Sequence, residues 1–361
     1  MKAREVLCAA LFVLCCSQAL AQAGRGAAAA ETLAGKKAEE SPWMLVPIFS
    51  VSPKLGASLG ALAGYLHYFD EKSQVSMFGL SAQYTSTGSI VAGAFGKASF
   101  DEDRQRVILA LIGGNIKNDY DDFLGTGQPL HSEDELRATA ARYLYRIYGD
   151  WFVGGQAVYT NFTTFGQSPL DQETLNVLGL TGFTSGGIGA NAYHDSRDNE
   201  SSATRGWLLN INNIAYREWI AGENNFDVYR ADFRSFWSHG EGNVFALRQN
   251  NQWTVDAPPS AFPSVMLRGY KMGQYLGRNM SSVEIEERYR LAEKWTATAF
   301  TGIACLYGDG KSCTDNANVF PDIGAGIQYV LRPKAGIVVN LEYAAGKAGN
   351  YGVYLKMGYG F

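Results

Sequence analysis

The sequence predicts an all-β fold, a single sixteen-stranded antiparallel β-barrel that spans a membrane. Three observations lead to this prediction: segments of strictly alternating residue type, a chain rich in aromatic residues and glycine (Tyr 20, Phe 19, Trp 7, Gly 41), and no apolar run long enough for a membrane-spanning helix. Alternation matters because successive side chains of a strand point to opposite faces of the sheet. A strand with lipid on one face and the barrel interior on the other needs this pattern.

The amino end has the pattern of an export signal. A short positive segment, 1–4, precedes the apolar segment 7–16, and the small residues of 19–21 offer a cleavage site. The sequence therefore predicts that residues 1–23 are a signal peptide, removed on export. Residues 24–41 are rich in Ala, Gly, Lys and Glu without alternation, and we predict a disordered linker there.

The predicted barrel occupies residues 42–361, where alternating segments follow one another from Trp43 onward. The last segment, 350–361, shows the pattern well, because large apolar side chains at odd positions alternate with mostly small or polar ones at even positions. An even number of strands puts both ends of the barrel on the same side of the membrane. The sixteen predicted strands lie at 43–50, 55–69, 74–86, 89–100, 104–116, 134–147, 151–164, 182–194, 204–217, 223–237, 243–255, 279–291, 295–306, 321–332, 335–345 and 350–361.

The connections between the predicted strands divide into short turns and long loops. Gly149 and Asp150 form one of the short turns, and the longest connections all join an odd-numbered strand to the next even-numbered one. Short turns on one rim and long loops on the other are typical of transmembrane barrels, with the short rim in the periplasm. The longest connections are 117–133, 165–181, 256–278 and 307–320.

Two predicted strands depart from the regular pattern. Segment 243–255 is polar on both faces from Arg248 to Gln252, so we expect that it is partly shielded from lipid, unless its register differs. The first strand contains Pro47, which lacks an N–H for the hydrogen-bond ladder and is tolerated mainly at a sheet edge. Its presence predicts weakened pairing between the first and last strands.

Two cysteines remain after the predicted signal peptide, Cys305 and Cys313. They are close enough in sequence to close a loop, and an exported chain meets an oxidising compartment. We therefore predict a disulfide between them on the extracellular side. The alternative is two unrelated thiols.

The sequence contains no recognisable constellation for catalysis, metal binding or nucleotide binding. The histidines lie in separate segments without a neighbouring nucleophile, and Asp232, flanked by Arg230 and Arg234 on one face, is predicted to be an ion-paired residue of the barrel wall. We predict no enzymatic activity, no cofactor and no metal, and a net charge of -4 gives no support to nucleic-acid binding. The histidines are His67, His131, His194 and His239.

Several segments together resemble one family. Leu267, Arg268, Gly269 and Tyr270 form an Arg-Gly-aromatic tip in loop 256–278. The next predicted strand carries a Glu-x-Arg pattern, and an Asp-x-Arg-Asp turn before the ninth strand ends in Arg-Gly. These patterns are similar to those of the BamA/TamA outer-membrane assembly superfamily, the bacterial surface antigen barrels. The residues concerned are Glu286 and Arg288 in the strand, and Asp195, Arg197, Asp198 and Gly206 in the turn.

This resemblance implies specific contacts. Arg268 is expected to pair with Glu286 inside the barrel, with Gly269 allowing close backbone approach and Tyr270 packing on the wall. Gly302 stands where the family often places an Asp, so a single carboxylate contact is expected for the arginine. The carboxyl end resembles the assembly signal of Gram-negative outer-membrane barrels, and its residues are Tyr359 and Phe361.

The resemblance also implies a role in outer-membrane biogenesis, or in insertion or transport of protein or lipid. The linker 24–41 is too short for the periplasmic POTRA module, so the chain resembles a short branch that is a bare barrel, for which a separate periplasmic partner could replace the module. Implied partners are outer-membrane lipids, lipopolysaccharide and the barrel assembly machinery, which would bind the last strand. Two alternatives stay open: a passive channel for small solutes, and a structural or adhesive surface antigen.

Overall fold

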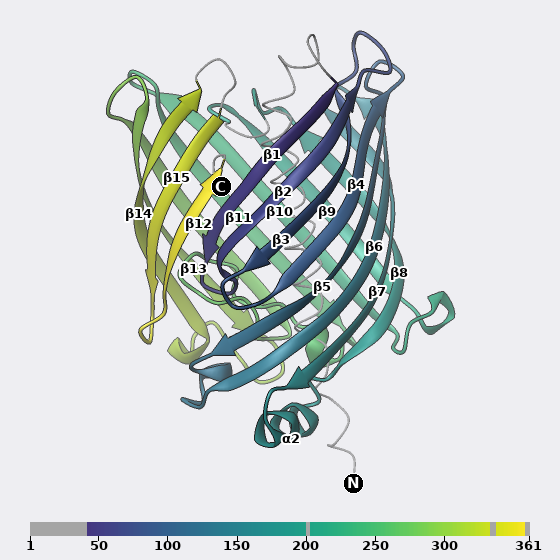
Figure 1. The fold of residues 1–361 in the computed structure, drawn as a ribbon, viewed down its shortest axis with the longest axis vertical. Helices are drawn as coiled ribbons and strands as arrows, with labels where there is room; N and C mark the ends of the chain where they lie inside the picture. Colours follow the sequence, from purple (N-terminus) through teal and green to yellow (C-terminus); the bar gives the residue numbers. More distant parts are fainter. Residues whose placement is uncertain (1–41, 200–202, 333–336, 358–361) are drawn as a thin grey trace.

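The computed structural model describes residues 42–199, 203–332 and 337–357 of the chain. Sixteen antiparallel strands close into one barrel in which each strand pairs with its neighbours in sequence and β1 pairs with β16 (Figure 1). The predicted fold is therefore confirmed. Among the described residues, no helix has the length and apolar character needed to cross a membrane. The strands are β1 (Trp43–Ser52), β2 (Gly56–His67), β3 (Ser76–Thr85), β4 (Ile90–Phe100), β5 (Gln105–Tyr120), β6 (Leu130–Tyr148), β7 (Trp151–Gly166), β8 (Gly182–Asp195), β9 (Gly206–Tyr216), β10 (Phe226–His239), β11 (Asn243–Val255), β12 (Asn279–Arg290), β13 (Trp295–Tyr307), β14 (Val319–Arg332), β15 (Ile337–Gly346) and β16 (Tyr351–Met357).

The two faces of the wall differ in the way that alternation predicts. Apolar side chains are exposed on the outer face, for example Leu45 at 72% and Trp43 at 68%, although the chain buries comparable residues elsewhere. Such an exterior is what a barrel presents to lipid. Further exposed apolar side chains of the outer face are Leu59, Leu80, Leu111, Ile303, Ile323 and Tyr343.

Strands β5 and β6 are longer than predicted on the side of the long loops. Strand β5 continues to Tyr120 and β6 begins at Leu130, and these two residues pair with each other. The outward residues of this extension, such as Lys117 and Glu133, are polar, whereas the inward ones are buried. Here the outer face meets water rather than lipid, and the loss of an apolar outward face is why the sequence pattern ended too early.

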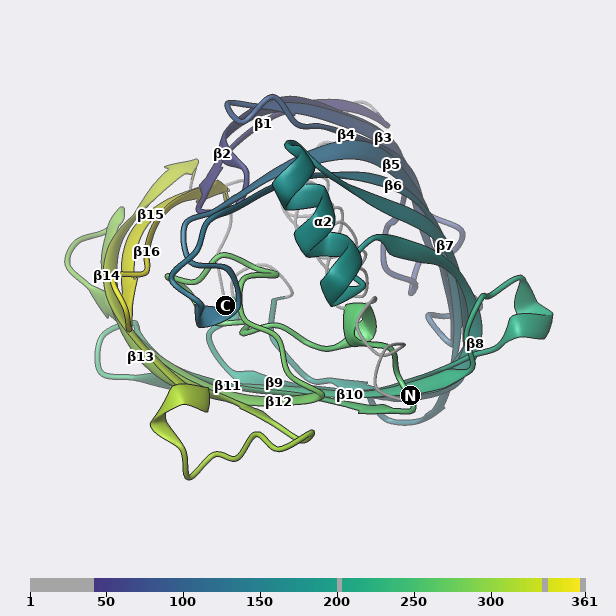
Figure 2. The ribbon, with the colours of Figure 1, turned by 90° about the horizontal axis from the view of Figure 1, so that it is seen from below.

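An apolar cluster fills the half of the barrel next to the long loops. It unites inward side chains of β5 to β10, such as Phe162 and Phe226, with Phe123 from the β5–β6 loop and Leu175 from a short helix. That helix, α2 (Pro169–Leu178), lies across the barrel mouth (Figure 2). The interior is therefore filled at this end by the protein's own loops.

Helix α2 differs from the sequence prediction, which placed only a long loop at 165–181. Its end signals are present: Ser168 accepts a hydrogen bond from the backbone N–H of Asp171, Pro169 occupies the first turn, and Gly179 ends the helix in the left-handed conformation (φ 61°). With ten residues, the helix is too short for apolar periodicity to stand out.

Strand β11 has the predicted bounds, and its register places Arg248 and Gln252 inward. Gln249 is exposed on the outer face, so nothing in the described chain provides the shielding from lipid expected at this residue. Inward, the Asp232 carboxylate pairs with Arg234 (2.7 Å) and Arg248 (3.2 Å). The expected pairing with Arg234 is confirmed, while Arg230 instead donates to the side-chain oxygen of Gln252 (3.2 Å).

The barrel closes at a seam between its first and last strands, β1 and β16. Val51 of β1 lies opposite Leu355 of β16, and on its other side β1 pairs with β2 from Trp43 to Ser52. In Figure 1, β16 is the short yellow arrow beside β1. No described residue of β16 lies opposite Pro47, so the weakened pairing expected there stays a prediction.

Candidate functional site

Loop 256–278 turns back into the barrel rather than outward. After the 3-10 turn η3 (Pro259–Ala261), Val265, Leu267 and Tyr270 are buried with side chains of β12 to β14. Figure 2 shows this loop as a green trace inside the ring of strands. The tip thus reaches the inner face of the wall that ends at the seam.

Arg268 is the centre of the site. Its guanidinium is 2.6 Å from the carboxylate of Glu286, also contacts Glu284, and lies 3.3 Å from Glu342 of β15. It also stacks 3.3 Å from the ring centroid of Phe300 on β13. The expected pairing with Glu286 is confirmed. The expectation of a single carboxylate contact is wrong, because three carboxylates surround the arginine.

The alternation of β12 explains why its charges gather here. Glu284, Glu286 and Arg288 lie two residues apart, so all three point inward, and each is at least 90% buried. Arg288 donates to Glu286 (2.8 Å), so each carboxylate oxygen of Glu286 faces a different arginine. A buried carboxylate needs such partners, because an unpaired buried charge is strongly unfavourable.

Gly302 has a different consequence from the one expected. It lies opposite Asp322 of β14, and a Cβ at Gly302 would be 2.7 Å from an Asp322 carboxylate oxygen. Asp322 is buried, and its charge interacts with Arg268 and Glu284. The carboxylate absent from β13 is therefore present on the adjacent strand. Sequence reasoning missed Asp322, although it alternates onto the inward face of β14 with Phe320.

Gly269 and Tyr270 attach the tip to the last strands. Gly269 has φ +92°, and its N–H donates to the hydroxyl of Tyr354 on β16 (2.6 Å). Tyr270 donates to the carbonyl of Pro321 (2.5 Å), and its ring fills the space that a Cβ at Gly346 would need. The expected close approach and wall packing are both present.

The Asp-x-Arg-Asp turn before β9 is held together by an ion pair and by hydrogen bonds within the turn. Asp195 pairs with Arg197 (2.7 Å), and Asp198 accepts hydrogen bonds from the backbone N–H and the hydroxyl of Thr204 (2.9 and 2.6 Å). Partial burial alone would raise the pKa of Asp198, but these hydrogen bonds hold it below its usual value. Gly206 has φ +95°, a conformation that favours glycine.

This turn connects with the loop tip through β12. Arg288 donates to the carbonyl of Ala203 in the turn (3.1 Å) and to Glu286, which binds Arg268. Two segments that resemble one family at separate places in the sequence thus belong to a single continuous hydrogen-bond network. The link through a backbone carbonyl has no side-chain pattern by which the sequence could indicate it.

A second ion cluster fixes the short turn 101–104. Asp103 pairs with Arg106 (2.7 Å) and contacts Arg146 of β6, while its backbone N–H donates to Ser73 (2.7 Å). Burial alone would raise the pKa of Asp103, but the Arg106 hydrogen bonds and the nearby arginine charges hold it below its usual value. The sequence pattern does not indicate this cluster.

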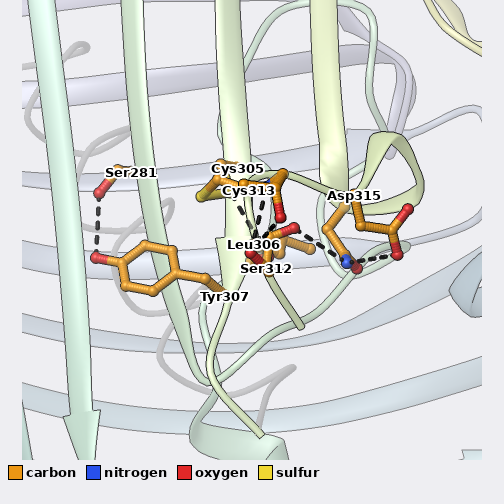
Figure 3. Close-up of a disulfide and its surroundings, with 9 residues drawn as sticks. Ser281, Cys305, Leu306, Tyr307, Ser312, Cys313 and Asp315 are labelled. Carbon is orange, nitrogen blue, oxygen red and sulfur yellow. Dashed lines mark hydrogen bonds between the residues drawn. A yellow bond between two sulfur atoms is a disulfide. The ribbon is translucent and has the colours of Figure 1, made fainter. Parts of the chain in front are cut away.

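The predicted disulfide is present. Cys305 at the end of β13 is bonded to Cys313 in the β13–β14 loop, with Cα atoms 5.6 Å apart (Figure 3). Tyr359 and Phe361, the proposed assembly signal, lie outside the described residues. Within the described ranges, no group of three or more potential metal ligands occurs.

Comparison with known proteins identifies the architecture. No family model matches the chain, and no curated protein matches it. Solved structures do. BamA from Haemophilus ducreyi lacking POTRA domains 1-3 superposes over 88% of this chain with a TM-score of 0.62 and 12% identity. The fold is that of BamA and CdiB. CdiB from Escherichia coli covers 88% of the chain (TM-score 0.62, 11% identity), and CdiB from Acinetobacter baumannii covers 87% (0.59, 10%).

The likeness at this level of identity is one of fold. The chain spans 70% of the BamA chain, and 63% and 59% of the two CdiB chains. The architecture agrees with the superfamily that the loop, turn and strand patterns resemble.

Proposed function

We propose that this protein is an outer-membrane barrel that acts in outer-membrane biogenesis by opening its wall between β1 and β16. The proposal rests on one observation: the loop tip binds the strands on one side of the seam between β1 and β16. The likeness to BamA and CdiB supports an outer-membrane location. Export by the amino-terminal signal, contact with lipids and lipopolysaccharide, and recognition of the last strand by the assembly machinery are parts of the same proposal.

The tip is positioned to control one edge of the seam. Arg268 contacts β12 and β15, Gly269 contacts β16, and Tyr270 contacts β14. In the proposed opening, the loop tip holds this group of strands together while β1 separates as the other edge. An unpaired strand edge is a template for another strand, which is how such a seam could act on a client.

We further propose that the barrel is not an enzyme and takes no cofactor. The ionised residues around the loop tip and the turns are engaged in structural pairs, as described above. A separate periplasmic protein that substitutes for a POTRA module also belongs to the proposal.

A disulfide across the seam tests the proposal. Val51→Cys combined with Leu355→Cys places two thiols on the register pair of the seam, and the matched control is Phe49→Cys with Leu59→Cys, a pair between β1 and β2. Both pairs are outward-facing residues of adjacent strands. We expect that the oxidised seam pair fails to restore a normal outer-membrane proteome and lipid asymmetry after depletion of the native protein, whereas the control pair restores both.

Full restoration by the oxidised seam pair would refute the opening of the wall. That result would favour the alternative function, a passive channel for small solutes. It would show as a planar-bilayer conductance that increases when the tip of loop 256–278 is removed, with no effect of the seam disulfide.

A further inference from the structure

We propose that the inner wall of β6 to β11 binds a small free oxyanion, a phosphate or carboxylate compound, between Arg142 and Arg230. These arginines belong to strands β6 and β10, away from the loop tip and its carboxylates. The inference does not depend on how the seam behaves.

Positive charge exceeds negative charge on this part of the wall. Arg142, Arg230, Arg234 and Arg248 are all half-buried and point inward, and Asp232 pairs with two of them, Arg234 and Arg248. Within the described residues, Arg142 and Arg230 make no ion pair. Arg142 donates to the side-chain oxygen of Gln156 (3.1 and 2.8 Å), and Arg230 donates to that of Gln252. A neutral amide oxygen leaves both charges uncompensated.

A chain of contacts brings the two arginines to the same place. Gln156, the partner of Arg142, donates to the side chain of Asn212 (3.1 Å), which lies opposite Arg230 in the β9–β10 ladder. Gln156 reaches across β8 because Gly189, its register partner there, has no side chain. Through this chain of contacts Arg142 and Arg230 come near enough for their like charges to repel each other. Two like charges held together by the wall favour an anion between them.

A buried donor near Arg230 also lacks a partner. Gln252 is 3% exposed, and its side-chain nitrogen makes no hydrogen bond in the described structure. A buried donor without an acceptor is costly, and an oxygen of a bound phosphate or carboxylate would satisfy it. Planar guanidinium groups suit both anions, because they donate two parallel hydrogen bonds.

An apolar cluster lies on one side of the two arginines. Val228, the next inward residue of β10 toward the long loops, belongs to the apolar cluster that fills that half of the barrel. Arg142 and Arg230 are half-buried, and the proposal places access to them on the opposite side, next to the short turns. Two positive charges beside an apolar cluster attract counter-ions. In the proposed orientation, the anion enters from the periplasm.

Phosphate binding to the full folded barrel tests this inference. The protein is kept in neutral detergent at low ionic strength, and titration calorimetry measures the binding of inorganic phosphate and of succinate. We expect saturable binding of at least one of these anions to the native protein and at least tenfold weaker binding to Arg142→Gln/Arg230→Gln. The matched control is Arg137→Gln, which removes an exposed arginine of β6 that pairs with Glu135 on the outer face, and it should bind like the native protein.

Thermal unfolding gives a second readout that separates binding from folding. Without anion, the double variant should unfold at the same temperature as the native protein or higher, because a like-charge contact is gone. Added phosphate or succinate should raise the unfolding temperature of the native protein and not that of the double variant. If the double variant does not fold, Arg230→Gln alone replaces it in both measurements.

Three results would overturn the inference. One is no saturable binding of either anion to the native protein, and another is equal binding by the native protein and the arginine variants. The third is binding of a short-chain phosphatidic acid without binding of phosphate or succinate, which would assign the arginines to a lipid headgroup rather than to a free anion.

Discussion

Replacing Arg268 by Ala should strongly destabilise the barrel. The substitution leaves Glu284, Glu286 and Glu342 buried without the cation that they share, and it removes the guanidinium from the ring of Phe300. Removing one partner of a buried ion pair costs about 3 to 5 kcal/mol, because the remaining charge stays buried. Arg288 still contacts Glu286, so we expect the lower half of this range.

The matched control is Arg137→Ala on the outer face. Arg137 also pairs with a glutamate, Glu135 (3.1 Å), but the two side chains are 77% and 45% exposed. Such a pair contributes about 0 to 1 kcal/mol. The assay is urea unfolding of each protein in lipid vesicles, followed by tryptophan fluorescence. Arg268→Lys should lie between native and Ala, since it keeps the charge and loses the planar fork.

A loss below about 1 kcal/mol for Arg268→Ala, equal to that of the control, would refute the reasoning. It would mean that the buried carboxylates take up protons or water at little cost, and that the contacts of the loop tip do not hold the wall.

Three further predictions follow from the site. Gly346→Ala should displace Tyr270 and cost about 1 to 3 kcal/mol; Tyr270→Ala/Gly346→Ala should cost no more than Tyr270→Ala alone in the same urea assay, and additive losses would contradict the contact. The pKa of Asp103 is below its usual value, so its stabilising effect is complete above about pH 4 and disappears as the pH falls further; protease cleavage at turn 101–104 should increase below pH 4 in the native protein, and Asp103→Asn should abolish that increase. Alkylation of unreduced, denatured protein should leave Cys305 and Cys313 unmodified, and labelling of both would exclude the bond.

Alternation carries most of what the sequence can predict. Because a period of two fixes the face of every residue in a strand, alternation places Glu286 and Arg288 on the same face, and the family resemblance selects Glu286 as the partner of Arg268. The same rule cannot find the third carboxylate of the site. Glu342 lies far along the chain on β15, and its approach to Arg268 depends on the curvature of the closed barrel and on how far loop 256–278 enters it.

The differences between prediction and structure share a physical cause. Alternation predicts the face on which a side chain lies but not the neighbour to which it binds. The sequence therefore predicts an ion pair of Arg230 with Asp232, whereas in the structure Arg230 donates to Gln252. Alternation gives no signal where the outward side chains of a strand are polar, and for this reason the predicted β5 and β6 are too short. Apolar periodicity is equally uninformative for a helix of only ten residues, so the sequence did not predict α2. Each of these features depends on tertiary surroundings.

Hydrogen–deuterium exchange of the barrel in lipid nanodiscs tests the central claim most directly. The account predicts that amides of β1 and β16 exchange at least tenfold faster than those in the middle of β12, because the proposed opening breaks the hydrogen bonds between β1 and β16 while the loop tip holds the other strands. Equal protection of β1, β16 and β12 would contradict a wall that opens at this seam.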